Sequence, residues 1–333
     1  MKIALKSAPF LNVFHCSDAH NEHTLNEKSH ISAETYYPKP KGAKAWSTNV
    51  LLLSGDMLKF KSYSMNVLWL EKVCSTFDHV VYVFGNHEFY NTNLDRPLSK
   101  LKEKTSHIDN LSILENEDVV FKIGRQEIAV IGATLWMDFD SSGDGTLINK
   151  NMSSLGYYNG PYDYAYTDFK AIRHKKGSGY ARITPEVLAS KFAVSKKFIF
   201  EKALKHKKLG RLVFALTHHS PSYFSASHFD GDTWLKGFIE KKNSLGVAPT
   251  FGLEAIGMLS GVPFEDGTQM YCSHLEKSVY ESEIDFWGHG HIHKSALYML
   301  GKTLVDNNPY GYYKSRNKAF REGPVMTIEV KHC

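Results

Sequence analysis

Several features that mark particular protein classes are scarce or missing in this 333-residue chain. It has only four cysteines, none in the C-x-x-C spacing of a zinc or redox motif, so we expect free thiols in a reducing compartment. No apolar run approaches the length of a membrane span. A lysine, a proline and an asparagine interrupt the apolar stretch after Lys2, which argues against a secretory signal. We therefore expect a cytoplasmic protein with no membrane partner.

The composition is that of a globular protein with a large core, at 42% hydrophobic and 23% charged residues. The formal net charge of +5 is mildly basic, which is compatible with an anionic substrate but does not require one. Basic residues are densest between Lys202 and Arg211, where we predict a solvated helix face. We find no internal repeat and no low-complexity tract.

Apolar runs and a helical pattern alternate along the first part of the chain. Residues 10–14, 49–53 and 80–84 are predicted to be strands, and residues 65–77 have helical spacing, which is typical of a layered α/β protein. Further strands are predicted at 211–216 and 285–287, and a hairpin of 119–122 with 127–134 turns at Gly124. Thr184 and Pro185 are expected to start a helix that ends near Gly210. The segment 302–330 alternates enough to supply two closing strands.

Two segments depart from this pattern, and we interpret them as insertions into one domain spanning residues 1–333. The first, about 139–180, is rich in Ser, Gly, Asn and Tyr, and we expect a long ordered surface loop without regular structure. The second, about 223–267, carries several glycines and two prolines and has the character of an insertion or a lid.

Short polar motifs follow the apolar runs in a fixed order, at the strand ends where open α/β sheets place their ligands. They are Asp18-Ala19-His20, Gly55-Asp56, Gly85-Asn86-His87-Glu88, Thr217-His218-His219 and Gly290-His291-Ile292-His293. Together they supply the carboxylates, imidazoles and amide oxygen that two adjacent metal ions need, with Asp56 as the candidate bridge. Oxygen and imidazole ligands suit Mn first, with Fe, Zn, Co or Ni as alternatives. Such a site hydrolyses phosphate esters.

At these residues the chain resembles the calcineurin-like metallophosphoesterase superfamily, whose pattern is D-x-H, G-D, G-N-H-[DE], an isolated His and G-H-x-H. All five parts are present between residues 18 and 293. Segments 132–136, 217–222 and 308–312 are similar to a bacterial subfamily, so the resemblance covers almost the whole chain. It implies a β-sandwich flanked by helices in a four-layer α/β/β/α arrangement. Its motifs are specific for the fold and the metal site, but not for the substrate.

The last motif admits two registers, because G-H-x-H occurs twice between Gly288 and His293. The subfamily pattern, aligned on Trp287, favours His291 and His293 as ligands and leaves His289 beside them.

The resemblance also implies a role for each residue. Metal one would take Asp18, His20, Asp56 and His293, and metal two would take Asp56, Asn86, His218 and His291. A hydroxide bridging the two metals would attack phosphorus, and His87 would act as general acid on the leaving oxygen. We further expect Glu88 or Asp285 to orient ligand histidines, and Asp138 or Arg173 to line the pocket, where Arg173 could grip a phosphate.

The leading hypothesis is a phosphoesterase that acts on a small, nucleotide-like phosphomonoester or phosphodiester. A nuclease would use the same site and would need a basic groove with aromatic stacking positions, for which the sequence offers little. A catalytically silent binding scaffold is a third reading, but such a protein would be expected to lose ligands or the acid. Substrate identity, native metals and oligomeric state remain open.

Overall fold

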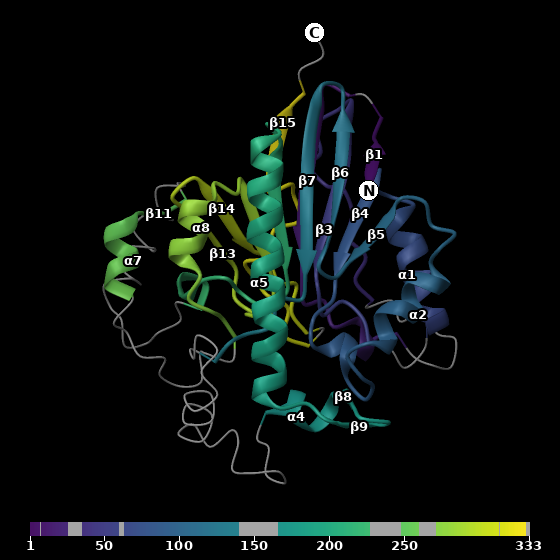
Figure 1. Ribbon diagram of the computed structural model, residues 1–333. Helices are drawn as coiled ribbons and strands as arrows, with labels where there is room; N and C mark the ends of the chain where they lie inside the picture. The colour runs from purple at the N-terminus through teal and green to yellow at the C-terminus, as the bar shows by residue number, and fades with distance from the viewer. Residues whose placement is uncertain are drawn as a thin grey trace.

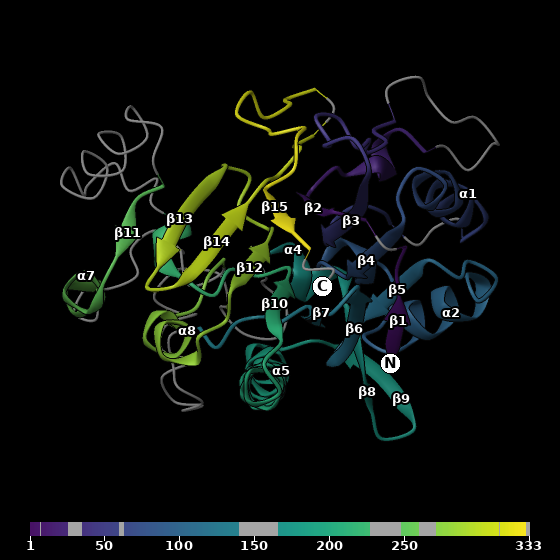
Figure 2. The ribbon, with the colours of Figure 1, turned by 90° about the horizontal axis from the view of Figure 1, so that it is seen from above.

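The structure is a computed structural model and describes residues 1–6, 8–25, 35–59, 63–139, 166–226, 248–259, 271–312 and 314–330. Two β-sheets lie face to face and helices cover their outer sides, as Figures 1 and 2 show from two directions. This is the mixed α/β arrangement predicted from the sequence.

The smaller sheet has five strands in the order β15-β2-β3-β4-β5. Its central strands β2 (Phe10–Cys16), β3 (Ser47–Ser54) and β4 (His79–Val83) are parallel and almost fully buried, which explains their near-continuous apolar runs. β5 (Leu111–Leu114) continues the parallel order, and β15 (Met326–Glu329) pairs antiparallel with β2.

The larger sheet has eight strands in the order β1-β6-β7-β10-β12-β14-β13-β11. Its centre is the parallel run of β7 (Gln126–Ala133), β10 (Leu212–Thr217) and β12 (Phe286–His289). The remaining strands are β1 (Lys2–Ala4), β6 (Glu117–Ile123), β11 (Thr250–Phe251), β13 (Ala296–Leu300) and β14 (Thr303–Asn307). Because β2, β3 and β4 are also parallel, each sheet offers a set of strand C-termini for functional side chains.

The period of two along β3 shows how the layers are held together. Val50 and Leu52 face the larger sheet, where they pack with residues such as Phe214 and Phe286. Leu51 and Leu53 point the other way, into the cluster that includes Trp69 of helix α1. Alternate side chains of one strand therefore bind the two sheets together and hold the helices on the outside.

The helices pack on the outer faces of the two sheets (Figure 2). α1 (Tyr63–Cys74) and α2 (Arg96–Lys104) lie beside the smaller sheet, and α5 (Pro185–Lys208) runs across β7 and β10 of the larger one. α8 (Glu276–Ser282) packs beside α5. Shorter elements are the helices η1 (Asn21–His23), η2 (His87–Phe89), η3 (Tyr223–Ala226), α4 (Thr167–Ala171) and α7 (Leu253–Leu259), and the ribbon of β8 (Arg173–Lys176) with β9 (Gly179–Arg182).

Most predicted elements are confirmed to within a few residues. The hairpin turning at Gly124 is β6–β7, and the helix that begins at Pro185 is α5, which ends at Lys208. The prediction that the tract up to residue 180 lacks regular structure is wrong for its last part, where α4, β8 and β9 form. The rest of that tract, and most of the predicted insertion at 223–267, lies outside the described residues. The strands β1, β5 and β13 and the helices α2 and α8 were not predicted from the sequence.

Three cysteines, Cys16, Cys74 and Cys272, are buried free thiols, in agreement with the prediction. Within the described ranges, no helix combines the length and the apolar character that a membrane crossing requires.

The packing between the sheets yields a direct stability prediction. Leu52 is completely buried, whereas Leu68 on α1 is 49% exposed. We expect Leu52→Ala to lower the free energy of unfolding by about 2–5 kcal/mol, because it leaves a cavity, and Leu68→Ala to lower it by less than about 0.5 kcal/mol. Urea unfolding of the two variants measures both values. Equal losses would show that the core between the sheets is looser than described.

A second prediction concerns pH. His79 on β4 is buried beside Phe121, and burial lowers the pKa of its imidazole from 6.5 to about 4. The folded protein thus keeps His79 neutral, while the unfolded chain takes up a proton below about pH 6.5. Stability from this residue is complete above pH 6.5 and is lost as the pH falls towards 4.

His79→Gln should therefore reduce the loss of unfolding free energy between pH 7 and pH 5 by about 1–2 kcal/mol. The amide side chain can still bond to Ser112 Oγ, which lies 2.8 Å from His79 Nε2 in the native protein. Urea unfolding at several pH values measures the slope. An unchanged slope would mean that His79 does not stay neutral in the folded state.

Candidate metal centre

The motif residues meet at the C-terminal ends of five strands. Asp18 and His20 follow β2, Asp56 follows β3, Asn86 and His87 follow β4, His218 follows β10, and His291 and His293 follow β12. Among the residues that the structure describes, three groups have ligand atoms within 4.8 Å of one another: Asp18 with His20 and His293, His20 with Asp56 and His87, and Asp56 with His218 and His291. The structure thus brings together every residue that sequence analysis assigned to metal binding, with Asn86 joining through His218.

The loops that present these side chains have strained backbones. Asp18, His20, Asp56 and His291 have φ angles of 52°, 45°, 53° and 68°, in the left-handed region that residues with a β carbon rarely adopt. Bonds between loops hold this geometry, since Asp18 N donates to Gly55 O at 3.0 Å and His20 N to Asp56 O at 2.9 Å. Such strain clusters at functional sites, where the surrounding structure compensates for its cost.

His218 anchors one half of the centre. Its Nδ1 donates to the carbonyl oxygen of Ser54 at 2.8 Å, so Nε2 is left with a lone pair. That Nε2 lies 3.0 Å from Asn86 Oδ1, 3.1 Å from His291 Nδ1 and 3.6 Å from Asp56 Oδ2. All of these atoms can accept a hydrogen bond or bind a cation. They converge on one point.

The amide of Asn86 is oriented by partners that the sequence does not reveal. Its Nδ2 donates to Asp168 Oδ1 at 2.8 Å and to Tyr90 Oη at 3.0 Å. With both donors engaged there, Oδ1 faces His218. Asp168 lies on α4, and the neighbouring Tyr166 Oη lies 3.2 Å from His291 Nε2. The described end of the tyrosine-rich tract therefore borders the centre.

The other half of the centre surrounds His20. Its Nδ1 donates to Glu22 Oε1 at 3.1 Å, which directs Nε2 towards His293 Nε2 at 3.1 Å and Asp56 Oδ2 at 4.0 Å. His293 Nε2 also lies 3.4 Å from Asp18 Oδ1. Asp56 Oδ2 is thus shared by the two halves.

The donor set and its spacing fit metal ions. A divalent ion about 2.1 Å from its ligands holds neighbouring ligands about 3 Å apart when they bind at right angles. The facing ligand atoms of His20 and His293, of His218 and Asn86, and of His218 and His291 are 3.0–3.1 Å apart, which matches this spacing. A hydrogen bond cannot account for the contact between Asn86 Oδ1 and a neutral His218 Nε2, because neither atom donates. The residues present can therefore hold two ions with Asp56 between them.

Burial determines the charges in the centre. Burial raises the pKa of Asp56, and the nearby carboxylates of Glu88 and Asp18 raise it further. Burial also lowers the pKa of His218 to about 4, so this imidazole is neutral. Asp18 behaves differently, because the hydrogen bond and charge of His293 outweigh burial and lower its pKa. His293 therefore offsets part of the negative charge while neutral His218 does not, and the remaining negative charge favours a cation.

Glu88 is buried and holds the loop that carries Asp56. Its two carboxylate oxygens accept bonds from the backbone N–H groups of Asp56, Met57, Leu58 and Gly85 at 2.8–3.0 Å, and from Tyr82 Oη at 2.5 Å. The expectation that Glu88 orients a ligand histidine is replaced by this role, because all of its partners are backbone groups and a phenol. A β carbon at Gly85 would overlap the Asp56 carboxylate, which explains the glycine.

His87 lies at the edge of the centre with 18% of its side chain exposed. Its Nδ1 donates to Glu22 Oε1 at 2.9 Å, and its Nε2 lies 3.8 Å from Asp56 Oδ2. Glu22 thus links His87 to His20. The hydrogen bonds from His20 and His87 lower the pKa of Glu22 despite its burial. Sequence analysis missed Glu22, although its position two residues after His20 was a usable signal.

Two neighbouring histidines lie beside the centre but point elsewhere. His289 Nε2 accepts from Ser225 Oγ at 2.7 Å, and its Nδ1 donates to Gly290 O at 3.0 Å. His219 Nδ1 donates to Thr134 O at 3.3 Å, and its ring packs on Trp136 at 5.3 Å between ring centroids. Neither belongs to the groups of convergent ligand atoms found in the described ranges.

Two of the other sequence candidates have partners outside the groups of convergent ligand atoms. Arg173 Nη1 donates to the carbonyl oxygens of Lys170 and Ile172, which gives the guanidinium a structural role in β8. Asp285 pairs with Lys207 and accepts from Val213 N at 2.7 Å, at the start of β12 and away from its C-terminal end. Asp138 is half-buried in the loop that leaves β7.

Beneath the centre, a buried network crosses between the two sheets. Arg321 Nη2 donates to both carboxylate oxygens of Asp306 at 2.7 Å, and Asp306 accepts from His15 Nδ1 at 2.7 Å. His15 Nε2 bonds to Ser54 Oγ at 2.8 Å, and the carbonyl of Ser54 holds His218. The ion pair between Asp306 and Arg321 is thus connected, through His15 and Ser54, to the ring of His218.

Comparison with known proteins agrees with this geometry. The family model described as calcineurin-like phosphoesterase matches residues 11–295. The chain is 22% identical over 254 residues to the uncharacterized protein L509 of Acanthamoeba polyphaga mimivirus, covering 75% of this chain and 74% of that protein.

Among solved structures, phosphopantetheinyl hydrolase (PptH) from Mycobacterium tuberculosis superposes with a TM-score of 0.55. The two share 13% sequence identity, and the superposition covers 92% of each chain. At 13% identity, this structural similarity supports the fold alone. The family model covers the part of the chain that contains the strand-end motifs. This chain belongs to the calcineurin-like phosphoesterase family and is a metal-dependent phosphoric ester hydrolase.

Proposed function

We propose that the protein hydrolyses a small phosphomonoester or phosphodiester with the help of two divalent metal ions. The observation that carries this proposal is the pair of convergent ligand sets that share Asp56 Oδ2. Asp18, His20, Asp56 and His293 would hold one ion, and Asp56, Asn86, His218 and His291 the other. Once bound, the ions would polarise the phosphoryl group and lower the pKa of water, and Mn is our first choice.

The chain supplies the general acid. The Nδ1–H bond to Glu22 fixes the ring of His87 and turns Nε2 towards the side of Asp56 where a phosphoryl group would lie. A protonated Nε2 can then donate to the leaving oxygen as the ester bond breaks. The Glu22 carboxylate stabilises the imidazolium form during this step, as the buried acid of a catalytic triad does.

Aromatic side chains border the exposed side of the centre and suggest the kind of leaving group. Tyr312 stacks on His20 with ring centroids 4.2 Å apart, and Tyr271, which is 38% exposed, lies 5.2 Å from the ring of His291. Planar groups pack well against such rings. We therefore favour a small, nucleotide-like substrate.

The β8–β9 ribbon favours a nuclease as the second candidate. It carries Arg173, His174, Lys175, Lys176 and Arg182 and no acidic residue, and its register places Arg173 opposite Arg182 and Lys175 opposite the exposed Tyr180. Basic groups with an aromatic ring are typical of surfaces that bind single strands. The ribbon is joined to the loop after Asn86, since Arg173 N donates to Thr92 O.

The proposal is tested by hydrolysis of phenyl phosphate, its diester and a single-stranded oligonucleotide. We expect turnover with Mn, loss of turnover after chelation, and a decrease of about 10²–10⁴-fold in kcat for His87→Ala, because the leaving phenoxide then lacks its proton donor. Dinitrophenyl phosphate, whose leaving group needs little protonation, should show a smaller decrease.

The surface variant His107→Ala is the matched control and should leave both rates unchanged, since His107 contacts only Glu71 among the ion pairs described. Preference among the three substrates separates monoesterase, diesterase and nuclease. A protein that binds Mn yet hydrolyses none of them would instead favour the binding scaffold.

Glu22 gives a separate prediction. Glu22→Gln removes the charge that holds both His20 and His87, and we expect kcat to fall by about 10–100-fold. Part of the loss should vanish with dinitrophenyl phosphate, because the acid is no longer needed there, and part should persist through His20. Kinetics with the two esters, together with metal content by mass spectrometry, measure how much of the loss arises through His87 and how much through His20. A loss that is identical for both esters would show that Glu22 acts on the metal side alone.

A further inference from the structure

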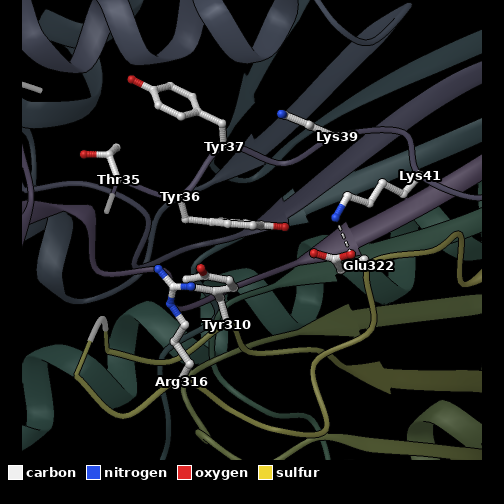
Figure 3. Close-up of a pocket in the computed structure, with 8 residues that line it drawn as sticks. All are labelled: Thr35, Tyr36, Tyr37, Lys39, Lys41, Tyr310, Arg316 and Glu322. Carbon is white, nitrogen blue, oxygen red and sulfur yellow. Dashed lines mark hydrogen bonds and ion pairs between the residues drawn. The ribbon is translucent and has the colours of Figure 1, made fainter. Parts of the chain in front are cut away.

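A cavity of about 360 Å³ lies beside the loop that carries Asp18 and His20, and it shares no residue with the candidate metal centre. Figure 3 shows its floor, where the ring of Tyr36 lies on the ring of Tyr310. The two centroids are 3.7 Å apart with 19° between the planes, and the guanidinium of Arg316 lies 5.2 Å from the ring of Tyr310. The edge of Phe320 packs against both tyrosines, so the floor is rigid.

The cavity has an excess of positive charge. Three cationic side chains line it, Lys39, Lys41 and Arg316, against one carboxylate, Glu322. That carboxylate already accepts from Lys41 Nζ at 2.6 Å, shown by the dashed line in Figure 3. Within the described part of the chain, no ion pair or hydrogen bond engages the charged groups of Lys39 and Arg316.

The cavity wall is also rich in hydroxyl groups. Thr35 is only 7% exposed, yet its Oγ1 has no hydrogen-bond partner among the residues that the structure describes. The same holds for the buried Oη of Tyr37. Buried polar atoms are nearly always hydrogen-bonded, so these two hydroxyls can take a further polar partner. Lys39 and Arg316 are exposed and free of protein carboxylates among the described residues, so they and the hydroxyls suit a ligand made of acceptors.

Hydrogen bonds tie this cavity to the metal centre. Asn21 follows His20, and its side-chain Oδ1 accepts from Tyr36 N at 3.0 Å while its Nδ2 donates to Tyr36 O at 3.4 Å. Tyr310 N donates to Ser17 O, the residue before Asp18, at 2.9 Å. Two residues further along, Tyr312 stacks on His20. A group held on the Tyr36–Tyr310 floor is therefore close to the chain segments that surround the reacting phosphate.

We propose that this cavity is a second phosphate site, which takes the non-reacting phosphate of a substrate with two phosphate groups. The inference rests on the proposed function, because it names the substrate class of the same centre. Lys39 and Arg316 supply the charge, the hydroxyls supply further donors, and Glu322 competes for Lys41 when the phosphate is absent. A monophosphate would bind at the metal centre alone.

Binding of inorganic phosphate to the Mn-loaded protein tests the site directly. We expect calorimetry to find two phosphates per chain in the native protein and one in the double variant Lys39→Gln/Arg316→Gln. The control variant Lys104→Gln/Arg125→Gln removes the same charge from exposed positions on α2 and the β6–β7 turn, and it should keep two. An unchanged count in the first variant would overturn the second site.

Kinetics then test the source of the phosphate. The cavity variant should raise KM for adenosine 3′,5′-bisphosphate by about tenfold or more and leave KM and kcat for adenosine 5′-monophosphate unchanged. A loss of one bound phosphate with no change in either KM would overturn the substrate assignment and identify free phosphate as the ligand. If neither nucleotide is hydrolysed, the proposed function fails for this class, whereas the phosphate count still decides whether the site exists.

Discussion

The repulsion among buried carboxylates is the constraint on which the rest of this structure depends. Asp18, Asp56 and Glu88 are at most 2% exposed, and Glu22 is close to them. Burial lowers the pKa of His20, His218 and His291 and leaves these rings neutral, whereas the contact with Asp18 raises the pKa of His293. A bound cation would offset the remaining negative charge in this low-dielectric interior.

The fold meets this constraint with rigid supports. Five backbone and phenol donors engage Glu88, and Ser54, His15 and Asp306 connect the ring of His218 to Arg321. Asn86 is turned by Asp168 and Tyr90. Each of these hydrogen bonds restricts the rotation of a ligand side chain. The side chains would therefore lose little conformational entropy when a metal binds.

Sequence alone could predict most of the central strands and the meeting of the motif residues, because each motif follows a buried strand and parallel strands end at one edge. It could not predict the partners of those ligands. Asp168 and Tyr166 come from a tract with no period, and Glu22 gains its role only when His87 approaches from β4. Arg173 was expected to line the pocket, whereas the fold directs its guanidinium to the carbonyl oxygens of Lys170 and Ile172. Side-chain partners follow from tertiary packing, which local pattern does not encode.

The pairing of β15 with β2 has a consequence for biosynthesis. β2 delivers Asp18 and His20 and is synthesised long before residues 326–329, which pair with it. A separation of 273 positions also lies between His20 and its neighbour His293. Contacts this distant in sequence form late, and a nascent chain would carry its acidic and imidazole groups open to solvent until then. A chain that ended before residue 291 would therefore lack His291 and His293 and could not form the complete centre.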